Sequence, residues 1–171
     1  MALGRPILIA ALASTLVAAQ DAPPPDRAVD VKRAVFDLCP KILAGNVSLD
    51  DPTQLAAIGY KGTPPRDTPG GRIPRAETGE GATKIVIAGH GGNNPSCGVW
   101  FGGPDNRERV GEMLTEAGKL GYGVSPPASL GDGTMILKVS RKSPASSFAV
   151  IMADAGGEFG GHPATTITYL N

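Results

Sequence analysis

His90 and His162 are the only histidines in the chain, and their side chains are the best suited to acid–base chemistry or ligand binding. Each lies among glycines, in residues 89–92 and 160–163. Imidazole titrates near neutral pH, and glycine lets a ligand approach the backbone closely. If the fold brings the two loops together, they predict a binding or acid–base site. Asn93, beside the first loop, is the third candidate binding residue.

The simpler interpretation is a pair of exposed loop histidines, and the sequence favours it. No Asp or Glu lies at a spacing that would hold an imidazole tautomer, and no third metal ligand is evident. We therefore assign no catalytic residue, no metal site and no cofactor. Two function classes stay open. One is a non-enzymatic protein that binds an envelope protein or a small ligand, and the other is a small hydrolase or metal-dependent enzyme that uses His90 and His162.

Cys39 and Cys97 are the only cysteines. In an exported protein an even pair indicates a disulfide, because oxidising compartments remove free thiols. Closing so long a loop stabilises the folded state by about 4 kcal/mol in the chain-entropy model. The alternative is a thiol nucleophile or a pair of metal ligands.

The first residues predict export. Residues 1–19 contain Arg5, an apolar run at 7–17, and small residues that end at Ala19, which is the pattern of a cleavable signal peptide. The proline-rich segment 20–27 is then an extended leader. The apolar run is well short of the ~20 residues that cross a bilayer, so we expect no membrane span in the mature chain. The predicted location is the periplasm or the medium, and the alternative is an uncleaved helix.

Composition predicts one domain, residues 28–171, without a nucleic-acid partner. Sixteen Lys and Arg balance sixteen Asp and Glu, so no global field attracts a polyanion. The 24 glycines and 16 prolines predict long irregular connections rather than a helical bundle.

Three segments show helical patterns. Apolar residues recur at helical spacing from 28 to 42 and place Cys39 on the buried stripe, while Pro40 is expected to kink or end that helix. Asp51, followed by proline, predicts the N-cap of a second, short helix. The clearest pattern begins at Asp105 and continues as an apolar stripe of Val110, Met113, Leu114, Ala117 and Leu120.

Five short runs rich in β-branched or aromatic residues predict strands, at residues 84–88, 97–101, 135–140, 148–153 and 165–170. Trp100 alternates with Val99 and Phe101, and is interpreted either as core or as a surface anchor for a partner; packing in the core is favoured. The proline- and glycine-rich stretch 61–82, with Ile73 as its one large aliphatic residue, predicts a flexible loop. The predicted fold is α+β, with N-terminal helices, a mostly antiparallel sheet of about five strands and one amphipathic helix packed on it.

The motifs Phe36-Asp37-Leu38-Cys39 and Ser96-Cys97-Gly98-Val99-Trp100 resemble those of small, exported, two-cysteine proteins of proteobacteria. The resemblance implies export and the disulfide. No activity is known for that group, so it implies no site residues.

Overall fold

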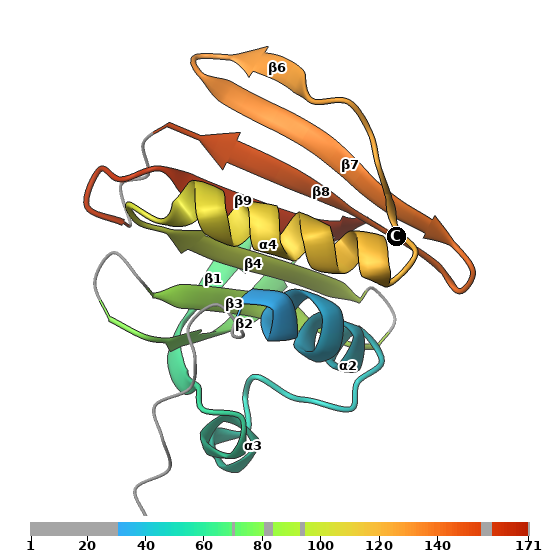
Figure 1. Cartoon of the computed structure of the whole chain (residues 1–171). Coiled ribbons are helices and arrows are strands. Elements are labelled where there is room, and N and C mark those ends of the chain that lie inside the picture. The colour runs from blue at the N-terminus through green and yellow to red at the C-terminus, as the bar shows by residue number, and fades with distance from the viewer. Residues whose placement is uncertain (1–30, 70, 81–83, 93–94, 155–158, 171) are drawn as a thin grey trace, which may run out of the picture.

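The chain folds around one antiparallel sheet of nine strands, seen in a computed structural model (Figure 1). The structure describes residues 31–69, 71–80, 84–92, 95–154 and 159–170. The predicted signal peptide and leader lie outside them. The strands are β1 (Lys61–Thr68), β2 (Gly71–Thr78), β3 (Ile85–His90), β4 (Ser96–Gly102), β5 (Gly123–Val124), β6 (Ala128–Gly131), β7 (Thr134–Lys142), β8 (Ala145–Ala153) and β9 (Ala164–Leu170).

The helices are few and mostly short. They comprise the π-helical segment η1 (Ala34–Leu38), which runs into α2 (Cys39–Leu43), then α3 (Pro52–Ala57) and α4 (Asn106–Lys119). Within the described residues, no helix has the length and apolarity needed to cross a membrane.

The predicted α+β class with about five strands is wrong, because the fold is mostly β. All five predicted strands are present, as β3, β4, β7, β8 and β9. The four additional strands lie in segments for which the sequence pattern predicts no strand. Two of them, β1 and β2, occupy most of the stretch 61–82, and the short strands β5 and β6 precede β7.

The β1–β2 hairpin forms despite its prolines because each proline lies where no ladder hydrogen bond is required. Pro64 and Pro65 fall in a bulge of the edge strand β1, between Thr63 and Arg66. Edge strands and bulges are where a sheet tolerates proline. In β2, pairing with β3 begins only at Arg75, one residue after Pro74. The backbone hydrogen bonds of the hairpin therefore form although its strands lack an alternating apolar pattern.

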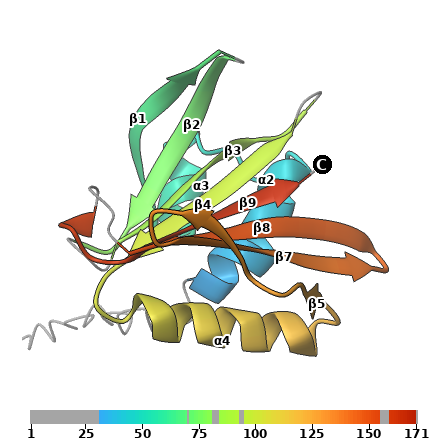
Figure 2. The same cartoon turned by 90° about the horizontal axis from the view of Figure 1, so that it is seen from above.

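The strand order is β1-β2-β3-β4-β9-β8-β7-β5, and β6 also pairs with β7. Every pairing is antiparallel. The sheet is strongly twisted, so that β1 and β2 point in a clearly different direction from β7 and β8 (Figure 2). Because of this twist, the β1–β2 hairpin is turned away from β7 near the opposite edge of the sheet, and one face of the hairpin is directed toward the middle strands.

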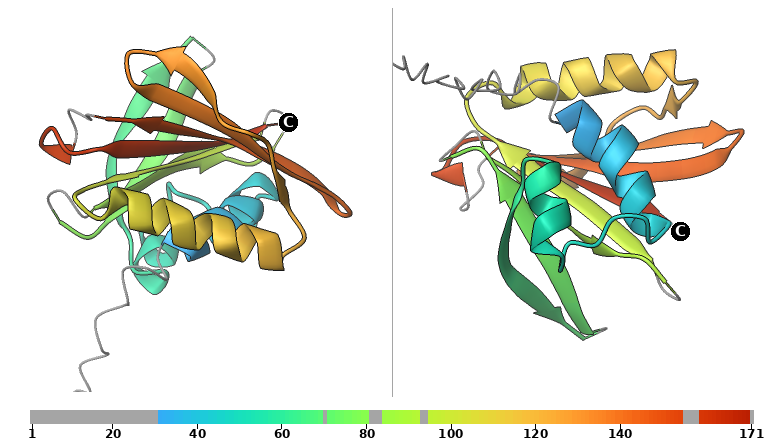
Figure 3. Two further views of the ribbon diagram at one scale, coloured as in Figure 1. Left: turned by 45° about the horizontal axis from the view of Figure 1, so that its top comes forward. Right: turned by 90° about the horizontal axis from the view of Figure 1, so that it is seen from below.

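The core lies between the helices and one face of the sheet. The helices α2, α3 and α4 all lie on the same side of the sheet (Figure 3). The strands present alternate side chains to that side, as the two-residue period requires. The largest fully buried side chains of this core are Phe101, Phe148, Leu38, Ile42, Ile85, Ile87, Met113, Ile167, Val31, Val35 and Val99.

Helix α4 and the predicted cap of α3 agree with their sequence patterns. Val110, Met113 and Ala117 of α4 are buried. At α3 the Asp51 carboxylate accepts from the backbone N–H groups of Thr53 and Gln54, at 2.8 and 3.2 Å. The predicted N-cap is therefore confirmed, and so is the stripe at these three residues. Leu114 is only half-buried, and the prediction was wrong at Leu120, which is exposed and follows the end of α4.

Pro40 alters the first helix without ending it. The backbone N–H of Cys39 bonds to the carbonyl of Ala34, five residues back, which is π-helical geometry. In that register the carbonyl of Val35 would accept from the N–H of residue 40, but proline has none. The Tyr169 hydroxyl of β9 donates to Val35 O instead, at 2.6 Å.

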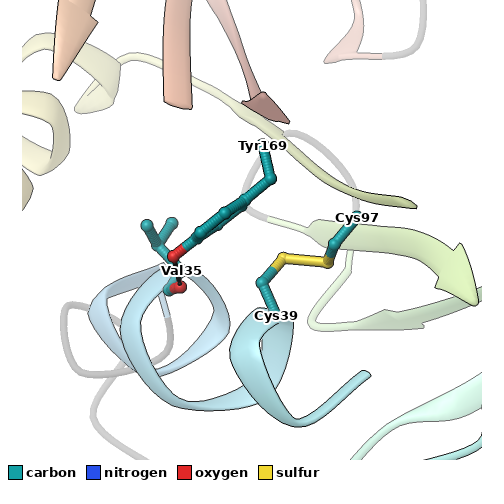
Figure 4. The surroundings of a disulfide bond; sticks show 4 residues. All are labelled: Val35, Cys39, Cys97 and Tyr169. Carbon is teal, nitrogen blue, oxygen red and sulfur yellow. Dashed lines mark hydrogen bonds between the residues drawn. A yellow bond between two sulfur atoms is a disulfide. The ribbon is translucent and has the colours of Figure 1, made fainter. Parts of the chain in front are cut away.

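The predicted disulfide is present and joins this helix to the sheet. Cys39 and Cys97 are bonded with their Cα atoms 5.6 Å apart, and both residues are buried. Figure 4 shows the Tyr169 hydroxyl at the helix backbone and the disulfide beside it. Two links, one covalent and one hydrogen-bonded, therefore fasten the helix to strands β4 and β9.

Candidate functional site

The two histidines do not form one site. His90 ends β3 and pairs with Ser96, the first residue of β4. His162 precedes β9, near Pro163, whose carbonyl accepts from Gly103 just beyond the other end of β4. Since β4 has seven residues, about 20 Å of strand separates the two ends. Asn93 lies outside the described residues.

His90 lies beside a small cavity of about 230 Å³, whose lining includes Asp50 and the loop glycines. Its Nδ1 is 3.1 Å from the carbonyl oxygen of Gly91. His162 is exposed. Within the described part of the chain, no group of three or more His, Cys, Asp or Glu could hold a metal ion. Among the residues that the structure describes, neither imidazole forms a hydrogen bond or an ion pair with a carboxylate of the kind that orients a catalytic base.

A more substantial hollow lies on the sheet face opposite the helices. It has a volume of about 450 Å³, and residues of β1, β2, β3, β4 and β9 surround it. We call it the Trp100 pocket, and its lining is Arg66, Thr68, Ile73, Arg75, Ala88, Ser96, Cys97, Gly98, Trp100 and Thr168. A volume of this size suits a small organic molecule.

The register of the strands explains why this face is hollow. Arg75 pairs with Ala88, Ala88 with Gly98, and Gly98 with Thr168. Directly paired residues of antiparallel strands share a face, so these four form one row across the sheet. The two middle members carry only a methyl group and a hydrogen, so their own side chains do not fill the space above them.

Trp100 covers the adjoining part of the floor. A Cβ added to Gly98 would lie 2.7 Å from Cη2 of the indole, so the ring lies directly over this glycine. Gly98 thus permits a close approach that any other residue would block. The indole is only partly buried, and it offers an apolar wall to the pocket.

The Ser96 hydroxyl is the polar group of the pocket that most needs a partner. Its Oγ is buried and has no hydrogen-bond partner among the described residues. An unpaired buried hydroxyl is rare in folded proteins, because its desolvation is not compensated. Thr68 and Thr168 bring two further hydroxyl groups to the lining.

The charge at the pocket is positive. Arg66 and Arg75 contribute guanidinium groups from the β1–β2 hairpin, and the described lining contains no acidic side chain. Glu77, two residues after Arg75 on the same face of β2, is engaged by Lys61 and Lys84, with N–O distances of 3.6 and 3.9 Å. These lysines offset the nearby carboxylate.

The sequence analysis missed this site for two reasons. The composition of the stretch that carries Arg66 and Arg75 predicts a flexible loop, and the sequence favours packing in the core over a surface anchor for Trp100. The available signal was the alternation of β4, because Trp100 must face away from Val99 and Phe101, which are both fully buried. Gly98 shares the outward face of Trp100 and marks a close approach.

Comparison of the chain with protein-family models, with curated proteins and with solved structures gives no match.

Proposed function

We propose that this chain is an exported, disulfide-stapled binding domain that takes a small organic ligand into the Trp100 pocket. The observation that carries the proposal is the pocket itself, a hollow of about 450 Å³ that combines two arginines and a tryptophan with the Ser96 hydroxyl, which has no hydrogen-bond partner among the described residues. A mostly apolar hollow with a few convergent polar groups is the usual form of a ligand site.

Export is supported by the signal-like pattern of residues 1–19 and by the disulfide. The bond between Cys39 and Cys97 is buried and ties two distant segments together, as structural disulfides do in oxidising compartments. Fractionation of the expressing cells tests it. We expect the mature chain, cleaved after Ala19, in the periplasm or the medium, and full-length precursor in the cytosol would contradict it.

The enzymatic alternative had rested on His90 and His162 acting together. Their positions at opposite ends of β4 remove its geometric basis. A binding role requires no such pair, and it uses the side chains that the fold does bring together.

Ligand binding can be measured by tryptophan fluorescence, because Trp100 is the only tryptophan of the protein. Small molecules extracted from the envelope and medium of the expressing cells are fractionated and titrated into the wild-type protein while its tryptophan emission is recorded. Ala88→Leu is the variant that blocks the pocket, since the larger leucine side chain fills the hollow. Ala128→Leu, an identical change at an exposed position of β6, is the control.

We expect at least one fraction to shift the emission of the wild type and of Ala128→Leu while leaving Ala88→Leu unchanged. The proposal fails if no fraction acts on the folded wild type, or if Ala88→Leu responds like the wild type. Circular dichroism establishes that each variant is folded.

A further inference from the structure

We infer that the ligand of the Trp100 pocket is a small organic anion, a carboxylate on a flat apolar body. The inference rests on the proposed function and specifies its ligand class. It follows from how the pocket divides into a cationic wall and an apolar wall.

The cationic wall belongs to the β1–β2 hairpin. Arg66 on β1 and Arg75 on β2 both line the pocket. Guanidinium groups present paired donors that match the two oxygens of a carboxylate. Because the described lining holds no acid and Glu77 is engaged by two lysines, the field inside the pocket favours an anion.

The apolar wall belongs mainly to β4. The indole of Trp100 lies close against Gly98, and the neighbouring lining residues Ala88 and Ile73 are apolar. Aromatic faces stack with flat rings in offset geometry. A ligand whose ring lies along this wall can direct its charged end toward the hairpin.

The hydroxyl groups complete the match. Ser96 Oγ is buried without a partner among the described residues, and it lies in the lining with the Thr168 hydroxyl. The Thr68 hydroxyl already donates to the carbonyl oxygen of Gly71, at 2.7 Å. A hydroxyl can donate to a carboxylate oxygen. A ligand carboxylate that reaches Ser96 would thus supply a hydrogen bond that the described residues do not provide.

The size of the hollow limits the ligand to a small molecule. A volume of about 450 Å³ lies near the lower end of the range for ligand pockets. It accommodates one aromatic ring with a short acid side chain. The probe chosen is therefore 3-phenylpropanoate, and its neutral counterpart is 3-phenylpropanamide, which has nearly the same shape.

The experiment titrates both probes and acetate into the protein, with tryptophan emission and calorimetry as readouts. We expect 3-phenylpropanoate to bind at least tenfold more tightly than the amide, because a hydrogen bond to an ionised group is about twice as strong as one between neutral groups. Acetate, which lacks the flat body, is expected to leave the emission unchanged.

Two arginine variants locate the charge effect. Arg66→Gln removes a guanidinium from the pocket at an exposed position, where substitutions usually change stability little. Arg72→Gln removes the same charge from the same hairpin, but Arg72 does not line the pocket. We expect Arg66→Gln to weaken 3-phenylpropanoate about tenfold and to leave the amide unaffected. Arg72→Gln should behave like the wild type.

Each outcome decides the question. Equal binding of acid and amide, or equal effects of Arg66→Gln and Arg72→Gln, would overturn the anionic ligand. If no probe binds but extracted compounds still act on the wild type and not on Ala88→Leu, the ligand class is wrong and the proposed function stands. If neither probes nor extracts act, both proposals fail.

Discussion

The Tyr169 hydroxyl donates a hydrogen bond of 2.6 Å to the carbonyl oxygen of Val35, across 134 residues of chain. The bond satisfies a helix carbonyl that Pro40 leaves without its N–H donor. It therefore couples a local backbone defect in the first helix to the last strand of the sheet.

Tyr169→Phe tests this coupling. The substitution keeps the ring but leaves a buried carbonyl unpaired, so we expect the free energy of unfolding to fall by about 1–3 kcal/mol. Urea denaturation measures the change. In a Pro40→Ala background, residue 40 regains an N–H that can bond to Val35, so the same substitution should cost about half as much. Strictly additive losses in this double-mutant cycle would contradict the role assigned to Pro40.

The buried phenol also predicts a dependence of stability on alkaline pH. Burial, aided by nearby Tyr122, raises the pKa of Tyr169 above its ordinary value near 10, while Arg141 opposes this weakly. Above about pH 10 the unfolded chain releases this proton while the folded chain retains it, so stability declines as pH rises through this window. Denaturation curves from pH 8 to about 11 should show a steeper decline for the wild type than for Tyr169→Phe. Parallel curves would count against the shifted pKa.

The disulfide leads to one prediction about the stability of the protein and one about the reactivity of the bond toward reductant. Replacing Cys39 and Cys97 together by alanine should lower the free energy of unfolding by about 4 kcal/mol, because the unfolded chain regains the entropy of a long open loop. Both residues are buried, at 0% and 2% exposure, so dithiothreitol should not reduce the bond in the native protein. Thiol labelling with and without urea, followed by non-reducing mass spectrometry, measures this. Rapid labelling without urea would disprove the buried bond.

Replacement by alanine is expected to change stability in opposite directions at two glycines outside the pocket. Gly111 is exposed in the middle of α4, and an added Cβ would meet nothing within 4 Å. Gly111→Ala should therefore stabilise the protein by about 0.5–1 kcal/mol through helix propensity. At Gly102 of β4 the added Cβ would lie 2.5 Å from Cγ of the buried Phe159, so Gly102→Ala should destabilise it. Thermal unfolding of the two variants checks the signs, and a stabilised Gly102→Ala would show that the ring moves freely.

Several elements could be predicted because their information is local. The stripe of α4, the Asp51 cap and the five apolar strands follow from the spacing of residues within one segment. The β1–β2 hairpin could not be predicted in this way. Its strands alternate no apolar residues, and they are stable because a neighbouring strand pairs with them.

The candidate site depended still more on tertiary structure. His90 and His162 are similar in their glycine-rich surroundings, yet the topology places them at opposite ends of β4. Arg75 and Gly98 lie on different hairpins, and they form one row only because β2, β3 and β4 pair in this register.

The sequence by itself determined the periodic helices and strands and, with only two cysteines, the sole intrachain disulfide partner for each. The tertiary structure decided which face of β4 carries Trp100 toward a hollow, and which carbonyl receives the Tyr169 hydroxyl. The physical reason is range. Periodicity and capping act over one or two turns of chain, whereas strand register and pocket shape depend on pairings between segments that the sequence separates.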